Sequence, residues 1–250
     1  MKDSTNNIQQ LLRRAIAAQV DMGLGEVILR GGKAAAQMPQ VGQKEVTRVV
    51  SVMNLFGKPD MKKVSASYES LPSHCAAICN CQLCSLGATR NKFVYGVGNP
   101  DADLMFIGEA PGADEDRLGE PFVGRAGQLL DKILAAIQLS RQQVYIANIL
   151  KCRPPNNRDP LPEEMEKCFP YLDEQIHLIK PKLICALGRV AAQALLKTSA
   201  PLGKLRKNWH SYEGIPMLIT YHPAALLRFP TYKKDTWEDM QMLKARLDSL

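Results

Sequence analysis

From Cys75 onward, short apolar runs alternate with longer segments whose apolar residues recur at helical spacing, and this alternation constrains the fold more than any other feature. Such an order is typical of successive β-α-β units, in which parallel strands pair and helices cover both faces. We expect strands over residues 103–107, 144–149, 183–187 and 217–220, and helices over 124–137, 162–179, 189–196 and 235–247. The predicted fold class is α/β, a three-layer αβα sandwich with a central, mostly parallel four-stranded sheet.

The chain before this region lacks the alternation, and we expect residues 1–72 to form an N-terminal extension ahead of a folded domain over residues 73–250. Apolar residues on one helical face predict a short amphipathic helix over about residues 6–21. From about residue 23 to 73, Gly, Pro, Gln and Lys mix with apolar residues without a sustained period. This composition favours a flexible linker.

The charge balance suits a polyanionic partner without proving one, since 32 Lys and Arg face 25 Asp and Glu, a formal charge of +7. Two basic clusters are candidates for nucleic-acid contact: Lys151, Arg153 and Arg158, and Lys204, Arg206 and Lys207. A solvated charged face is the commoner meaning of such runs. No apolar run approaches the roughly 18 residues of a membrane span, and the N-terminus is polar. We therefore expect a cytoplasmic protein without membrane association.

Cysteine is the residue type that most strongly indicates a metal site. Without an export signal, reducing conditions disfavour disulfides for the 7 cysteines. Cys81 and Cys84 form a pair separated by two residues, and Cys152 and Cys168 supply two more thiols. Four thiolates satisfy tetrahedral zinc as well as an iron-sulfur cubane, so the spacing leaves both metals open.

The other cysteines are weaker candidates for metal ligation. Cys185 lies inside a predicted strand, where a cysteine usually fills a small buried apolar position. Cys75 and Cys79 stay as second-choice ligands.

Polar loops follow three of the predicted strands, at Gly108–Gly112, Asn148–Arg158 and His222–Leu227. In open α/β sheets, ligands bind beyond the carboxyl ends of the strands. The three loops are therefore expected to converge on one pocket.

Four segments in and near these loops resemble the successive motifs of family 4 uracil-DNA glycosylases. They read Gly-Glu-Ala-Pro-Gly from 108, Gly-Glu-Pro-Phe-Val-Gly-Arg-Ala-Gly from 119, Asn-Ile-Leu-Lys-Cys-Arg-Pro-Pro from 148 and Tyr-His-Pro-Ala from 221. The resemblance is highly specific, keeps the family's order and runs from about Cys81 to the C-terminus. It leaves out the N-terminal extension.

The resemblance implies a DNA-repair hydrolase that flips uracil out of DNA and breaks its N-glycosidic bond, leaving an abasic site for base excision repair. It makes residues 73–250 the catalytic domain and uracil-containing DNA the partner. It also implies one 4Fe-4S cluster per chain, held by Cys81, Cys84, Cys152 and Cys168. We expect a monomer whose N-terminal extension docks on the domain, binds a repair or replication protein, or has no specific role.

Three side chains are then assigned to the flipped base. Phe122 would stack on it, the amide of Asn148 would match the uracil edge and reject cytosine, and His222 would stabilise the departing uracilate from O2. Each has a structural alternative: a core aromatic, a turn former and a structural histidine.

Chemistry at the sugar is less sharply assigned. Glu109 and Glu115 are candidate catalytic carboxylates, while Ala110 stands where some other glycosylase families carry a water-activating aspartate. Backbone groups at Ala110 and Pro111, with Glu109, are expected to line the pocket. The acidic run around Glu115 could equally be a surface feature.

The last loop is expected to face DNA. Leu226 or Leu227 could fill the space left by the flipped base, or simply pack in the core, while Arg228 and Arg206 would meet phosphate. Two other classes of function stay open at this point. These are a non-enzymatic DNA-binding or polymerase-associated module, and an electron-transfer or redox-sensing iron-sulfur protein.

Overall fold

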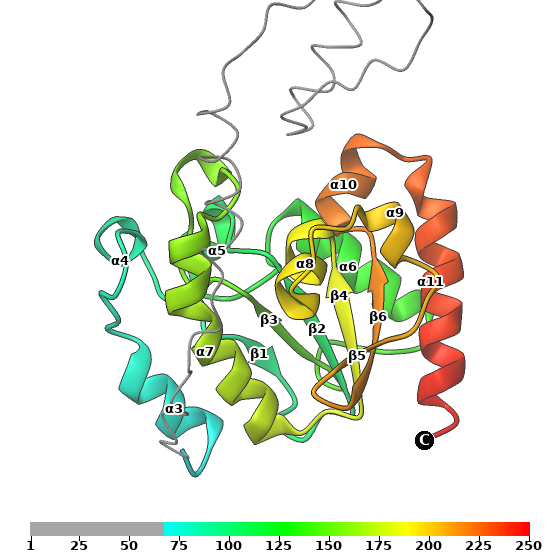
Figure 1. Ribbon diagram of the computed structural model, residues 1–250, viewed down its shortest axis with the longest axis horizontal. Helices are drawn as coiled ribbons and strands as arrows, with labels where there is room; N and C mark the ends of the chain where they lie inside the picture. Colours follow the sequence, from blue (N-terminus) through cyan, green and yellow to red (C-terminus); the bar gives the residue numbers. More distant parts are fainter. Residues whose placement is uncertain (1–67) are drawn as a thin grey trace, which may run out of the picture. The chain divides into compact units, whose positions relative to one another are not determined.

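The computed structural model describes residues 68–250, and the helix predicted over residues 6–21 lies outside the described residues. A six-stranded sheet in the order β1-β3-β2-β4-β6-β5 forms the centre of this part (Figure 1). The four central strands are parallel, and both edge strands are antiparallel to their neighbours. The strands are β1 (Val97–Gly98), β2 (Leu104–Gly108), β3 (Tyr145–Asn148), β4 (Leu183–Leu187), β5 (His210–Tyr212) and β6 (Ile215–Thr220).

Helices cover both faces of this sheet and connect its strands. They are α3 (Leu71–Ile78), α4 (Leu86–Thr89), α5 (Ala113–Leu118), α6 (Arg125–Ala136), α7 (Pro162–Ile179), α8 (Arg189–Leu196), α9 (Leu202–Leu205), α10 (Pro223–Arg228) and α11 (Tyr232–Leu247), with a short 3₁₀ helix at Pro155–Asn157. One apolar cluster joins the sheet to α7 and α8, and a second joins its other face to α6 and α11. The fold is thus an αβα sandwich.

The central strands are apolar at every position because both of their faces are buried. In β2, Met105 and Ile107 contribute to the cluster under α7 and α8, whereas Leu104 and Phe106 contribute to the cluster under α6 and α11. None of the four is more than 1% exposed. Continuous apolar runs of this kind are expected for parallel strands covered on both sides.

The order of the strands defines where a ligand can enter. The chain passes from β2 to β3 on one side and later returns to place β4 on the other side of β2. Loops that leave β2 and β4 therefore diverge at their carboxyl ends, which is where such sheets bind ligands.

The sequence predicted the four central strands and the helices α6, α7, α8 and α11, and the structure confirms them with shifts of one to three residues at several ends. The edge strands β1 and β5 were not predicted, because they are two and three residues long. The predicted loop after β6 is in fact the helix α10, begun by a proline at its first turn.

The first described helix begins two residues ahead of residue 73, the predicted start of the folded domain. Helix α3 starts at Leu71, whose side chain is buried, and the backbone N–H of Tyr68 donates to Glu174 Oε1 on α7. Among the described residues, no helix is long and apolar enough to cross a membrane.

Candidate active site and four-cysteine centre

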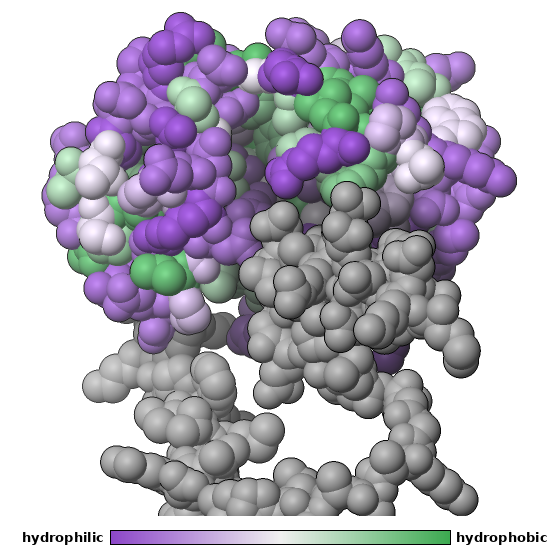
Figure 2. Space-filling view, turned by 90° about the horizontal axis from the view of Figure 1, so that it is seen from above, coloured by the Kyte–Doolittle hydropathy of each residue, from purple (hydrophilic) through white to green (hydrophobic). Residues whose placement is uncertain are grey.

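The carboxyl ends of β2 and β3 come together at Gly108 and Asn148, which are partners in the sheet register. Gly108 has to be small, because a Cβ there would lie 2.7 Å from Phe122 Cζ and would also overlap Asn148 Oδ1. The absence of a side chain lets the ring and the amide approach the same space. Figure 2 looks onto this side of the domain from above, where hydrophobic residues border a hollow in a largely hydrophilic surface.

The side chain of Asn148 is buried, and its amide oxygen is free to accept a hydrogen bond from a ligand. The residue is 2% exposed, and its Oδ1 has no hydrogen-bond partner among the described residues. A buried polar atom without a partner costs free energy unless a ligand or water satisfies it. The backbone carbonyl of Asn148, by contrast, accepts a 2.9 Å bond from Lys151 Nζ.

Phe122 lies in a conformation that its neighbours enforce. Its φ of 55° is unusual for an aromatic residue. Arg141 donates 3.0 Å and 2.7 Å bonds to the carbonyls of Phe122 and Pro121. Gly127 on α6 lies so close to the Phe122 carbonyl that any Cβ would overlap it. The ring is therefore held beside His222, with 5.4 Å between the ring centroids.

Glu115, a predicted catalytic carboxylate, is hydrogen-bonded to the backbone of the loop that carries Phe122. Its Oε1 accepts 2.9 Å bonds from the N–H groups of Val123 and Gly124, and its Oε2 accepts from Gly112 N at 3.1 Å. These three hydrogen bonds from backbone donors hold the loop around Phe122 in its conformation. A catalytic role for Glu115 stays a prediction.

His222 caps the N-terminus of α10 and is neutral at physiological pH. Burial, with a smaller contribution from the charge of Arg228, lowers its pKa to about 4. Its Nδ1 accepts a 3.2 Å bond from Ala224 N, so the single ring proton resides on Nε2. A Cβ at Gly188 would lie 2.9 Å from His222 Cβ, so the turn after β4 also has to be glycine to leave room for this residue.

Glu109, the first residue after β2, is a carboxyl group that titrates near neutrality. Burial, and to a lesser degree the charge of Asp159, raises its pKa to about 7, while Arg189 and Arg228 oppose the rise. A group with such a pKa can both accept and release a proton at neutral pH.

The residues after Glu109 continue the loop as predicted, with Pro111 buried and Ala110 partly buried. The exposed end of α10 lies beside the candidate pocket, since the charge of Arg228 acts on both Glu109 and His222.

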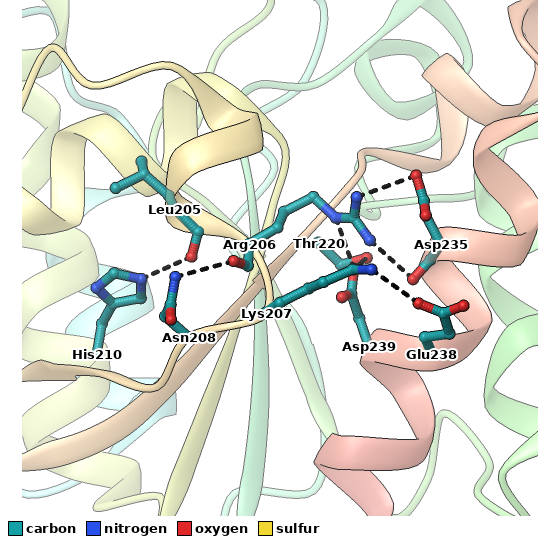
Figure 3. A network of polar contacts seen from close by, with 9 residues as sticks. All are labelled: Leu205, Arg206, Lys207, Asn208, His210, Thr220, Asp235, Glu238 and Asp239. Carbon is teal, nitrogen blue, oxygen red and sulfur yellow. Dashed lines mark hydrogen bonds and ion pairs between the residues drawn. The ribbon is translucent and has the colours of Figure 1, made fainter.

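Two predicted DNA contacts need correction. Leu226 is 1% exposed and packs in the protein, because its side of α10 faces the interior, so only Leu227, 39% exposed, is left as the candidate wedge. Arg206 is also buried. Figure 3 shows its guanidinium directed at α11, where Nε lies 2.8 Å from Asp239 Oδ2 and Nη1 lies 3.2 Å from Asp235 Oδ2.

The Arg206 network supports the loop that carries His222. Asp239 Oδ2 also accepts a 2.7 Å bond from Thr220, the last residue of β6. The guanidinium covers the ring of Tyr221, 4.3 Å from its centroid, and that ring stacks on Tyr232 at 4.2 Å. Arg206 thus fixes the residues just before His222 and is not available to phosphate.

The four cysteines predicted as metal ligands line one pocket. Cys81, Cys84, Cys152 and Cys168 share it with apolar and basic residues: Leu83, Gly87, Arg90, Phe93, Lys167 and Tyr171. Cys75, Cys79 and Cys185 do not line this pocket, and Cys185 is fully buried in β4, as predicted.

Hydrogen-bond donors surround the sulfurs of this pocket. Arg90 Nη1 donates to Cys152 Sγ at 3.4 Å, the Tyr171 hydroxyl to Cys81 Sγ at 3.2 Å, and Lys151 N to Cys168 Sγ at 3.3 Å. Donors of this kind are expected around metal-bound thiolates, which they orient and stabilise. The residues present therefore fit a four-thiolate metal centre.

Several supporting residues were missed by the sequence analysis. Gly127 was part of a quoted motif but had no role assigned, and Lys151 was taken for a surface cation although it is completely buried. Gln175 and Asp239 carry no local signal, since only their burial against a buried cation shows their importance.

Comparisons with known proteins identify the family of this chain. A family model described as the uracil DNA glycosylase superfamily matches residues 95–241. The chain is 45% identical over 183 residues to a type-4 uracil-DNA glycosylase of Archaeoglobus fulgidus, which covers 70% of this chain and 92% of the relative.

Two further relatives carry the same description. A type-4 uracil-DNA glycosylase of Pyrobaculum aerophilum is 43% identical over 65% of this chain and 87% of its own length. One of Saccharolobus solfataricus is 45% identical over 68% of this chain and 82% of its own length.

Proposed function

The chain belongs to the uracil DNA glycosylase superfamily, and we propose that it is a type-4 enzyme that flips uracil from DNA and hydrolyses its N-glycosidic bond. The protein is a DNA-repair glycosylase that releases uracil. The roles proposed for its residues rest on one observation: the buried Oδ1 of Asn148, next to Phe122 and His222, has no hydrogen-bond partner within residues 68–250.

Asn148 is proposed to recognise uracil. Its Oδ1 needs a donor, which N3–H of uracil supplies, and its amide can donate to O4. Cytosine presents an acceptor at N3 and a donor at position 4, so both bonds would fail. A site whose buried polar atoms are left unpaired by the wrong base discriminates strongly against it.

Phe122 and His222 are proposed to hold the base and its developing charge. The phenyl ring offers a stacking surface, fixed by the bonds to its own loop. As the bond to the sugar breaks, negative charge grows on uracil O2, where the Nε2–H of neutral His222 would donate. A fixed donor aimed at a developing anion lowers the barrier without adding a full charge to the ground state.

Glu109 is proposed as the group that accepts a proton from the attacking water. With a pKa of about 7, a large share of this carboxyl is ionised at neutral pH and still basic enough for proton transfer. Its negative charge would also stabilise the positive sugar. Arg228, exposed at the end of α10, is suited to a nearby phosphate.

The four-cysteine pocket is proposed to hold the 4Fe-4S cluster that the family resemblance implies, on Cys81, Cys84, Cys152 and Cys168. Such a cluster would supply a fixed cross-link between three separate segments of the chain. The donors from Arg90, Tyr171 and the Lys151 backbone would stabilise the thiolates. Monomeric state, a cytoplasmic location and a protein partner for the N-terminal extension stay predictions.

The first test is incubation of cluster-loaded protein with labelled DNA that contains one uracil, followed by alkali to break abasic sites. We expect cleavage by the wild type and its loss in Asn148→Ala. The matched control is Asn156→Gly, an exposed asparagine with φ of 54° that glycine accommodates. The absence of cleavage by loaded wild type would overturn the proposed activity, and an unchanged Asn148→Ala would remove this residue from recognition.

A further inference from the structure

Lys151 is a completely buried cation at the centre of the domain. Its side chain is 0% exposed, and its Nζ donates to the Asn148 carbonyl at 2.9 Å and to Gln175 Oε1 at 2.5 Å. Both acceptors are neutral. Among the ion pairs of residues 68–250, none includes Lys151.

A buried ammonium needs a counter-charge, because transfer of an ion from water into a protein interior is costly unless it is compensated. Lys151 lies next to the four-cysteine pocket in two ways. It precedes Cys152 in the chain, and its own backbone N–H donates to Cys168 Sγ. Four thiolates around a zinc ion or a 4Fe-4S core leave a net negative centre, whichever metal is bound.

The other end of this network reaches the base pocket. Lys151 Nζ is bonded to the carbonyl of the residue whose side chain reads the base. Gln175 on α7 fixes the ammonium, and its own Nε2 donates to the Tyr95 carbonyl at 3.0 Å. The Lys151 carbonyl accepts from Val94 N at 2.9 Å. The lysine is therefore clamped at both ends and cannot move independently of Asn148.

We propose that Lys151 is a positioning residue for uracil recognition, which holds the Asn148 peptide in place while the four-thiolate centre supplies its counter-charge. The metal centre then acts on recognition electrostatically, as well as by cross-linking the chain. This inference rests on the proposed function, since it assigns Asn148 to uracil. It predicts that removing the metal harms discrimination through Lys151.

The test measures discrimination between two duplexes. One carries a non-cleavable 2′-fluoro-deoxyuridine and the other 2′-fluoro-deoxycytidine at the same position, and the ratio of their dissociation constants is determined with protein matched for iron content. Lys151→Met removes the charge and the donors but keeps the bulk. We expect the ratio to fall by about 10- to 100-fold, the range for losing a hydrogen bond from a charged donor. Lys132→Met, on the exposed face of α6, is the control.

Two double-perturbation cycles separate positioning from general damage. In the first, Lys151→Met is combined with Asn148→Ala, and we expect no further loss of discrimination, because the lysine acts through the asparagine. In the second, iron is removed by a chelator, and we expect removal to reduce discrimination in wild type but not in Lys151→Met. Equal losses on iron removal, or additive losses in the first cycle, would overturn the proposal.

A second variant covers the case in which Lys151→Met does not fold. Gln175→Glu places a carboxylate at the position that now contacts Nζ, so Lys151 gains a counter-charge from the protein itself. We expect its discrimination to depend less on iron than that of wild type. Unchanged dependence would contradict the proposal. Wild type that binds both duplexes equally would instead contradict the proposed function.

Discussion

The buried cations Arg206 and Lys151 each contact a segment that carries a pocket residue, but the groups around them differ. Arg206 supports the end of β6 before His222 and is paired with the carboxylates of Asp239 and Asp235. Lys151 lies at the end of β3, where its Nζ donates to the Asn148 carbonyl and to Gln175 Oε1. Its backbone N–H donates to Cys168 Sγ. Arg206 is thus neutralised by the chain alone, whereas the counter-charge that we propose for Lys151 comes from the four-cysteine centre.

The difference teaches that burial of a cation by itself does not define its role. Arg206 would be expected to keep its environment in protein without metal, because both of its partners are on α11. Lys151 would lose the counter-charge that we propose for it. Substitutions that change one cation's surroundings at a time test this contrast.

The largest expected effect is a loss of unfolding free energy in Asp239→Asn. This substitution removes the fully buried carboxylate that bonds Arg206 and Thr220, and breaking a buried ion pair from one side costs about 3–5 kcal/mol. Urea unfolding should show the loss equally in iron-loaded and iron-free protein. The control is Asp248→Asn, whose exposed pair with Lys244 should contribute little. A loss of stability that depended on iron would contradict the view that Arg206 is neutralised by the chain alone.

The next effect concerns the leaving-group side. We expect His222→Ala to lower the single-turnover rate of uracil release by about 10²- to 10³-fold, the usual result of removing one donor to a developing anion. Binding of the non-cleavable uracil duplex should change much less. His177→Ala, at an exposed position on α7, is the control. A variant that lost binding and rate together would place His222 in recognition as well.

The pH dependence of the rate of uracil release by the wild type should follow the ionisation of the Glu109 carboxyl group. Because the ionised form is the base and its pKa is raised to about 7, the rate should rise about tenfold per pH unit below pH 7 and level off above it. Glu109→Gln should be slow and lack this rise. His222, with a pKa of about 4, should add no step near neutrality. The same profile is expected in Asp239→Asn, since Arg206 does not contact Glu109.

The smallest effect is expected at the tip of α10. Leu227 is exposed beside the pocket, and Leu227→Ala should slow cleavage of duplex DNA a few-fold while sparing single-stranded DNA, in which no stack has to be opened. Leu226→Ala should instead lower the free energy of unfolding, because this side chain is buried. If Leu227→Ala cleaved duplex and single-stranded DNA at the same rates as Leu226→Ala, the proposal that Leu227 fills the space of the flipped base would be rejected.

Much of the fold was predictable because it depends on local periodicity. Apolar runs in β2, β3, β4 and β6 follow from burial on both faces, and helices such as α7 follow from one-sided patterns. The short edge strands β1 and β5 escaped prediction because their pairing depends on neighbours distant in sequence. The placement of Gly108, Asn148 and His222 at strand ends followed from the same pattern.

Local patterns in the sequence were enough to predict the layer architecture, the four candidate cysteine ligands and the residues that resemble the family's pocket. Which charged side chains face solvent depended instead on contacts between distant parts of the chain. Lys151 and Arg206 both stand in basic clusters of the sequence, yet both are buried, because partners on α7 and α11 come from far along the chain. The backbone donors that bind Glu115 likewise come together only in the folded chain.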